Sequence, residues 1–204
     1  KKKDKRVALK LILHRRTKTI DFKIVQGKEI DFSLSQGTTS RATAFCPVCG
    51  GGIDDNTVKR EAREDRMGQR LVAVVLHRPN RHGKTYRIAD DKDVETFRQV
   101  EKHLEEKIKN WKWEFSPVPE EPTPLGGGPG AERAFSIRKY GLDSWGDLFN
   151  DRQKLALITF ADKVRQVHEK MLTEGMEEEH ARTVVTYLAL ALDKLVETCS
   201  ALCR

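Results

Sequence analysis

The first 34 residues alternate between apolar and polar positions with a period of two, which is the pattern of strands with one buried face. The apolar positions fall in three runs: Val7, Leu9, Leu11 and Leu13; then Ile20, Phe22 and Ile24; then Ile30, Phe32 and Leu34. Polar breaks at residues 15–17 and 26–28 separate the runs. The pattern therefore predicts an antiparallel meander of three strands.

Two further strands and a helix are predicted between residues 71 and 112. Residues 71–76 and 84–89 read as strands, and the connector 77–83 combines turn residues with positive charge. Residues 91–112 then place apolar side chains at helical spacing. This spacing predicts an amphipathic helix, for which Asp90 or Asp91 is the expected cap.

The last third of the chain has a helical pattern. Asn150 with Gln153 resembles a capping box, and Gly175 is a typical helix stop. A second helix is predicted from about residue 178, so that the two form an antiparallel hairpin. This second helix is so apolar at residues 187–192 that we expect it to be buried on more than one side, against a partner that this chain does not supply.

Prolines and glycines divide the chain. Residues 114–134 contain five of the seven prolines and four glycines, so they are expected to be a linker without a core of its own. The predicted fold class is α+β: a small antiparallel zinc-ribbon-like sheet, then a helix and a C-terminal helical hairpin. The expected parts are a zinc-ribbon-like β domain with one helix at 1–113, the linker at 114–134 and the helical hairpin segment at 135–204.

The segment from Cys46 to Gly51, with Cys49 three residues after Cys46, has the form of a zinc knuckle. A structural zinc site takes four ligands, commonly from two such knuckles, and this sequence contains one. Either other residues complete the site, with His77 and His82 as the nearest histidines, or the missing ligands lie outside these 204 residues. The plain alternative is a pair of ordinary reduced thiols in a turn.

Composition narrows the class of protein. With 38% hydrophobic and 34% charged residues, the chain contains no apolar run near the roughly 18 residues of a membrane span. Its four cysteines are too few for a disulfide framework, so a reducing cytoplasm is expected. Residues 1–44 hold 12 Lys or Arg against 4 Asp or Glu. Such a surface suits contact with phosphates, and a solvated sheet face is an equal alternative.

Motifs for catalysis are missing from the pattern. The sequence has no glycine-rich dinucleotide loop, Walker motif, zinc-protease motif or nucleophile elbow, so whether it acts as an enzyme is uncertain. Aromatic and basic residues interleave at Trp111-Lys112-Trp113 and at residues 135–140. That pattern occurs in platforms that stack single-stranded bases, although such aromatics more often anchor a linker to a core. Cys199 and Cys203 are expected to be small apolar fillers of a helix face.

Several phrases of the sequence resemble one family, the adenine-specific DNA methylases that contain a zinc ribbon. The phrases are residues 45–51, 67–75, 84–87, 140–149 followed by Arg152 and Gln153, and 186–195 running on to 202–204. In order and rough spacing they cover nearly the whole chain. One departure is at residues 198–201, where the family suggests an Asn-Ser-Ser type of sequence.

The resemblance implies that this chain is an internal segment of a longer, S-adenosylmethionine-dependent methyltransferase. In the family, the motif that binds S-adenosylmethionine precedes this region and the catalytic Asp-Pro-Pro-Tyr motif follows it. An upstream knuckle would supply the two zinc ligands that Cys46 and Cys49 lack. The remainder of that enzyme, and DNA, would then be partners of this segment, and no membrane is expected.

The expected role is accessory: to hold DNA beside the catalytic fold while the target adenine is extruded. The candidate phosphate contacts are Arg15, Arg16, Arg78, Arg81 and Lys84. Exposed helices could also lead to homo-oligomers. The alternative from another class is a noncatalytic zinc-ribbon module that binds nucleic acid or a protein partner by itself.

Overall fold

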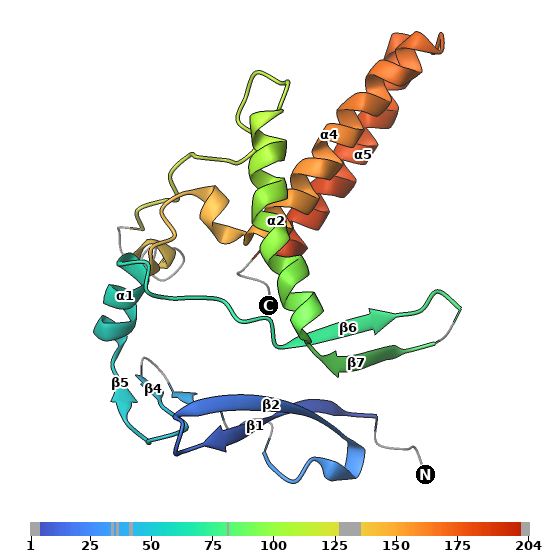
Figure 1. The fold of residues 1–204 in the computed structure, drawn as a ribbon. Coiled ribbons are helices and arrows are strands. Elements are labelled where there is room, and N and C mark those ends of the chain that lie inside the picture. Colours follow the sequence, from blue (N-terminus) through green and yellow to red (C-terminus); the bar gives the residue numbers. More distant parts are fainter. Residues whose placement is uncertain are drawn as a thin grey trace. The chain divides into compact units, whose positions relative to one another are not determined.

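The computed structural model describes residues 5–33, 35, 37–40, 43–80, 82–126 and 136–200. It confirms an α+β fold, with small antiparallel sheets followed by helices and a C-terminal helical pair (Figure 1). The chain divides into two compact units. Unit 1 comprises Lys1–Val94 with Lys139–Gly141, and unit 2 comprises Glu95–Arg138 with Leu142–Arg204.

Unit 1 begins with the predicted hairpin of β1 (Val7–His14) and β2 (Thr19–Gln26). The register pairs Leu9 with Ile24, Leu11 with Phe22 and Leu13 with Ile20, so the two apolar runs share one face of the ribbon. Lys18 closes the connecting turn with a left-handed φ of 55°. The period-two pattern is thus confirmed for the first two strands.

The third strand of the expected meander is wrong for residues 30–33, and Leu34 lies outside the described residues. Gly27 takes a left-handed φ of 55° and opens a short 3-10 turn, η1 (Gly27–Glu29), which redirects the chain after β2. Lys10 of β1 then donates to Asp31 at 2.8 Å and lies 6.0 Å from the centre of the Phe32 ring. Side-chain contacts, rather than strand pairing, hold this alternating segment.

A three-stranded sheet of very short strands follows, in the order β3 (Thr39–Ser40), β4 (Thr43–Phe45) and β5 (Gly52–Ile53). It leads into α1 (Asp55–Arg63), a helix that the sequence analysis did not predict. The Asp54 side chain caps α1 by accepting the Thr57 N–H at 2.6 Å. Tyr140 donates to Asp55 in the first turn of α1 at 2.9 Å, which ties residues 139–141 to this unit.

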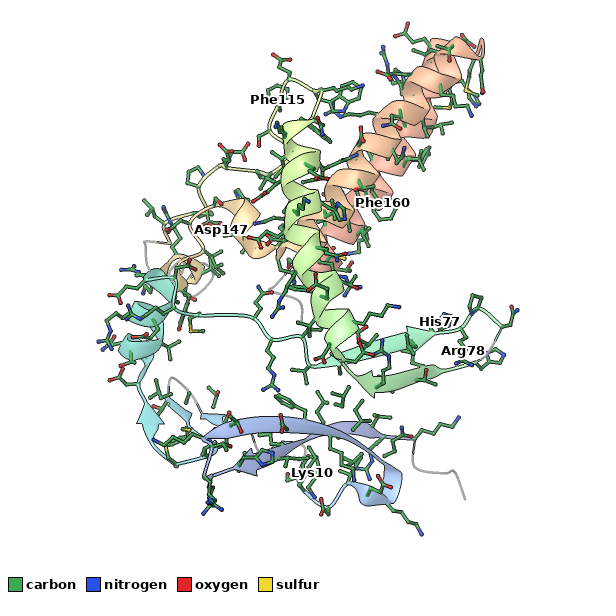
Figure 2. The ribbon with its side chains drawn as sticks, viewed as in Figure 1. Lys10, His77, Arg78, Phe115, Asp147 and Phe160 are labelled. Carbon is green, nitrogen blue, oxygen red and sulfur yellow. The ribbon has the colours of Figure 1, made fainter. Side chains whose placement is uncertain are left out.

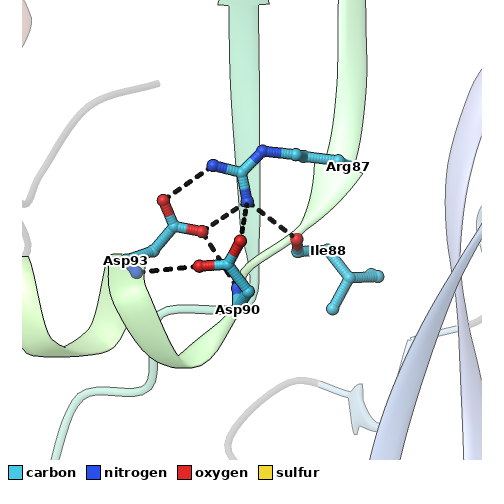
Figure 3. A network of polar contacts seen from close by, with 4 residues as sticks. All are labelled: Arg87, Ile88, Asp90 and Asp93. Atoms are coloured by element: carbon cyan, nitrogen blue, oxygen red, sulfur yellow. Dashed lines mark hydrogen bonds and ion pairs between the residues drawn. The ribbon is translucent and has the colours of Figure 1, made fainter.

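The second predicted hairpin is β6 (Ala73–His77) with β7 (Lys84–Ile88), followed by α2 (Asp91–Lys109). Asp90 caps α2 as expected: its carboxylate accepts the Asp93 N–H at 2.9 Å, and Asp93 accepts the Asp90 N–H at 2.9 Å. Arg87 reaches across from β7 and binds both carboxylates (Figure 3). This pairing with Arg87 holds the pKa of Asp93 below its usual range and fixes the turn from β7 into α2.

Unit 2 contains most of α2, a short 3-10 turn η3 (Trp145–Leu148), and the antiparallel pair α4 (Asp151–Thr173) and α5 (Glu178–Cys199). The capping box is confirmed, since Asn150 accepts the Gln153 N–H at 3.0 Å and Gln153 accepts the Asn150 N–H at 2.8 Å. Gly175 ends α4 with a φ of 84°, as expected of a helix stop. Another short 3-10 turn, η2 (Ile137–Tyr140), precedes residue 141.

Part of the proline-rich segment docks in an extended form against η3. Thr123 is 1% exposed, and its backbone N–H donates to Asp143 O at 2.8 Å. The N–H groups of Trp145 and Gly146 donate to Glu121 O and Pro119 O, at 3.1 and 2.9 Å. We call residues 117–123 the strap, because three backbone hydrogen bonds hold them to residues 143–146.

Few apolar side chains are fully buried. In the described part of the chain, Val25 is the buried apolar residue of unit 1, while unit 2 buries Leu104, Leu148, Ile158 and Ala181. Two-stranded sheets with so little buried area are marginally stable on their own. A bound metal or a covering partner would therefore contribute a large share of the stability of unit 1.

Candidate metal centre and nucleic-acid interface

The knuckle is built on the β4–β5 hairpin, which pairs Phe45 with Gly52. Cys46 N–H donates to Gly51 O at 2.9 Å, and Gly50 N–H donates back to Cys46 O at 2.8 Å. Gly50 has a left-handed φ of 74°, a conformation in which a residue with a Cβ would be strained. These contacts close a tight turn that contains both thiols.

The turn also favours the thiolate form of Cys46. The backbone N–H of Cys49, then that of Val48, then the Cys49 thiol form hydrogen bonds that lower the pKa of Cys46 below its ordinary value of 9.0. Cys46 is half-buried and Cys49 is exposed. Since thiolate is the form that binds zinc, two neighbouring sulfurs, one of them stabilised as an anion, suit two corners of a tetrahedral site.

A complete metal site is not formed by the described residues. Within residues 5–126 and 136–200, apart from their undescribed positions, no three His, Cys, Asp or Glu side chains gather in a metal-binding arrangement. His77 ends β6 and His82 lies in the β6–β7 connector, so neither joins Cys46 and Cys49 in such a group. Cys199 ends α5, and Cys203 lies outside the described residues.

The predicted phosphate-binding residues lie at the tips of the two hairpins of unit 1. Arg15 and Arg16 are in the β1–β2 turn, while Arg78 follows β6 and Lys84 begins β7 (Figure 2 labels Arg78). Arg81 lies outside the described residues. All four described side chains are exposed, and none makes an ion pair with another described residue. They are thus free to contact an anion.

The structure brings these residues together as two pairs rather than one patch. Arg70, just before β6, donates to Ile20 O at 2.6 Å and stacks over Phe22 at 5.3 Å. The start of β6 is therefore held near the β1–β2 turn, and the β6–β7 tip lies at the far end of that hairpin. Four strand residues, from 73 to 77, span about 13 Å. Sequence reasoning missed Lys18, an exposed cation in the same turn as Arg15 and Arg16.

Unit 2 contains a polar cavity of about 490 Å³ at the C-terminal end of α2. Its lining includes Lys107 and Asn110 from this end, Trp113 from the following loop, and Asp162 and Gln166 from α4. Lys107 forms an ion pair with Asp162 and lowers the pKa of that carboxyl. Sequence reasoning singled out the two tryptophans and missed these α4 residues, because no local pattern relates them to residues 55 positions away.

The two tryptophans of the loop after α2 have different surroundings. The Trp111 indole N–H donates to Phe115 O at 2.9 Å. Arg165 of α4 stacks over the Trp113 ring at 5.0 Å, and the Trp113 Nε1 atom is buried without a hydrogen-bond partner among the described residues. Phe115 is 74% exposed at the end of the same loop (Figure 2). The loop thus offers one fixed indole and one unsatisfied donor.

Comparisons with protein-family models, with curated proteins and with solved structures found no match. None of the described helices combines the length and the apolar composition that crossing a membrane requires. The methylase resemblance and its zinc and DNA implications therefore stay predictions.

Proposed function

We propose that this chain is an accessory, DNA-contacting segment of an adenine-specific (N6) DNA methyltransferase, and that Cys46 and Cys49 supply two of the four ligands of a structural zinc site. The observation that carries the proposal is the knuckle, in which hydrogen bonds close the turn around both thiols and lower the pKa of one. The methyltransferase context comes from the five resembling phrases of the sequence. S-adenosylmethionine would be bound by the rest of that enzyme, and this chain contributes no catalytic group.

Zinc, when bound, would crosslink the short β4–β5 hairpin to the chain that supplies the other two ligands. The gain is large for a unit in which Val25 is the buried apolar side chain of the described part. Zinc bound per chain, measured for the wild type and for Cys46→Ser and Cys49→Ser, tests this. We expect each serine variant to lose the zinc that the wild type retains. Less than about half an equivalent in the wild type would mean that two thiolates do not hold zinc without the other pair.

The two hairpin tips support the DNA-contacting role. Exposed cations without acidic partners are available for phosphates, whereas Lys10, Lys59, Arg66 and Arg87 of the same unit are already paired with carboxylates. With about 13 Å of strand between the end of β6 near the first tip and the second tip, the pairs would contact phosphates several nucleotides apart along a duplex. Such contacts position a duplex without reading its sequence.

Duplex affinity measured as a function of salt tests the role. Each phosphate contact contributes about 0.9 to the slope of log K against log salt. We expect the double variants Arg15→Ala/Arg16→Ala and Arg78→Ala/Lys84→Ala each to flatten the slope by about 1.8. The quintuple variant that also removes Arg81 should flatten it further.

A matched control removes two exposed cations from the helical pair, Lys170→Ala with Lys194→Ala. It changes the net charge by the same amount, so a general electrostatic effect would appear in it too. Slopes that stay unchanged in both hairpin variants would contradict DNA contact through the tips.

The alternative, a noncatalytic module that binds a protein or nucleic acid by itself, is favoured by one observation. Tyr187 and Leu190 on α5 are 72% and 61% exposed, as expected of a face covered by a partner. The gene sequence on either side distinguishes the two functions. A glycine-containing cofactor motif before this region and Asp-Pro-Pro-Tyr after it would support the methyltransferase.

A further inference from the structure

The polar cavity of unit 2 contains a hydrogen-bond donor that its own protein leaves unsatisfied. The Trp113 Nε1 atom is buried, and no described residue accepts its proton. A buried donor without a partner costs the free energy of its desolvation, so such groups usually have a ligand or water as acceptor. The cavity that Trp113 lines, at about 490 Å³, lies within the roughly 300–1,000 Å³ of small-molecule sites.

The charges of the lining favour an uncharged polar ligand. Lys107 and Asp162 neutralise each other in an ion pair, and the remaining charges, Lys112 and Glu169, are of opposite sign. A multiply charged group would therefore gain little electrostatic free energy here. A ligand with both donors and acceptors on its edge would use the carboxylates and the indole N–H together.

The shapes of the lining side chains favour a flat ring. Two indoles line the cavity, and Arg165 holds the Trp113 ring by stacking on it at 5.0 Å. Asn110 and Gln166 provide amide groups, which form paired hydrogen bonds with the N6 and N7 positions of adenine. Stacking on an aromatic ring is available to every base, and the amides add a preference for adenine.

We propose that this cavity binds an adenine base, presented by a nucleotide or by a single-stranded nucleic acid, with a ring nitrogen accepting the Trp113 indole proton. Lys112 at the cavity would pair with the phosphate attached to the sugar. The inference does not rest on the proposed function, because it concerns unit 2 and none of the hairpin cations or knuckle thiols takes part.

Calorimetric titration of the 204-residue chain with AMP tests the site, with CMP as the comparison and a short oligo(dA) to distinguish a free nucleotide from a strand. We expect AMP to bind more tightly than CMP. Trp113→Phe keeps a ring and removes the indole N–H, so it should bind AMP about fivefold to tenfold more weakly. The ligand-free variant should melt no lower than the wild type, because it has lost an unsatisfied buried donor.

Asn110→Ala is a second variant at an exposed position, and it should reduce the preference for AMP over CMP. Phe115→Ala is the matched control, since Phe115 lies in the same loop with its ring outside the cavity lining, and it should bind AMP like the wild type. The absence of AMP binding at millimolar concentration, or equal binding by Trp113→Phe and the wild type, would overturn the proposal.

Discussion

Gly146 marks the closest approach of the strap to η3, and its substitution by alanine is the sharpest test of how unit 2 is held together. A Cβ added at Gly146 would lie 2.7 Å from Val118 Cγ1 and 2.8 Å from Pro119 O. The Val118 side chain is stiff at its branched carbon, and the second neighbour is backbone, so the strap itself must move. Movement would also weaken the 2.9 Å bond from Gly146 N–H to Pro119 O.

The expected cost follows from these contacts. Overpacking of a well-packed site costs about 1–3 kcal/mol, and a weakened hydrogen bond adds about 1 kcal/mol. Alanine returns about 0.4–1 kcal/mol by restricting the unfolded chain. Gly146→Ala should therefore lower the unfolding free energy of unit 2 by about 1–3 kcal/mol and its melting temperature by roughly 5–15 °C.

Tryptophan fluorescence during denaturant unfolding reports this change selectively. The three tryptophans of the chain, Trp111, Trp113 and Trp145, all belong to unit 2. Gly68→Ala is the matched control, because a Cβ there would meet nothing within 4 Å and its φ is not left-handed. A Gly146→Ala protein within about 0.5 kcal/mol of the wild type would refute the docking of the strap.

Two further predictions concern the helices of unit 2. Asn150→Ala removes the acceptor that caps α4 and should cost about 1 kcal/mol of unfolding free energy, whereas Asn150→Asp, which keeps an acceptor, should cost much less. Denaturant unfolding of the two variants checks this, and equal losses would contradict the capping role. The ion pair with Lys107 holds the pKa of Asp162 below its ordinary value of 3.8, so its stabilising contribution is present above that pH and is lost as the pH falls. Melting temperatures from pH 7 to pH 3 should therefore decline less in Asp162→Asn than in the wild type, and parallel curves would contradict the pairing.

The elements that the sequence predicted correctly are those with long, regular patterns. Period-two alternation located β1 and β2, and helical spacing with the Asn150 box located α4. These signals are local, because each residue's partner is either a neighbour on the same element or its mirror position across a hairpin.

The errors have local causes that a hydrophobic pattern does not contain. Residues 30–33 alternate like a strand, but the left-handed Gly27 turns the chain and Lys10 binds Asp31. The helix α1 has only nine residues and a polar composition, so its one clear signal was the Asp54 cap of Thr57. Short elements of this kind depend on contacts that periodicity does not report.

The candidate sites divide in the same way. The knuckle was visible in the sequence because its ligands are three residues apart, and the structure adds the hydrogen bonds that lower the Cys46 pKa. The arrangement of the basic residues as two separated tips depends on Arg70 binding Ile20, fifty residues away. The cavity around Trp113 likewise joins α2 to α4 through Lys107 and Asp162. Contacts of this range come from tertiary packing and not from spacing.

The most direct measurement of the DNA-contacting role is the change in backbone amide chemical shifts when an adenine-containing duplex is added to the ¹⁵N-labelled chain. The account predicts that the largest shifts fall at the two hairpin tips, residues 15–18 and 77–84, and that they shrink as salt is added. Duplex binding that leaves both tips unshifted would contradict it.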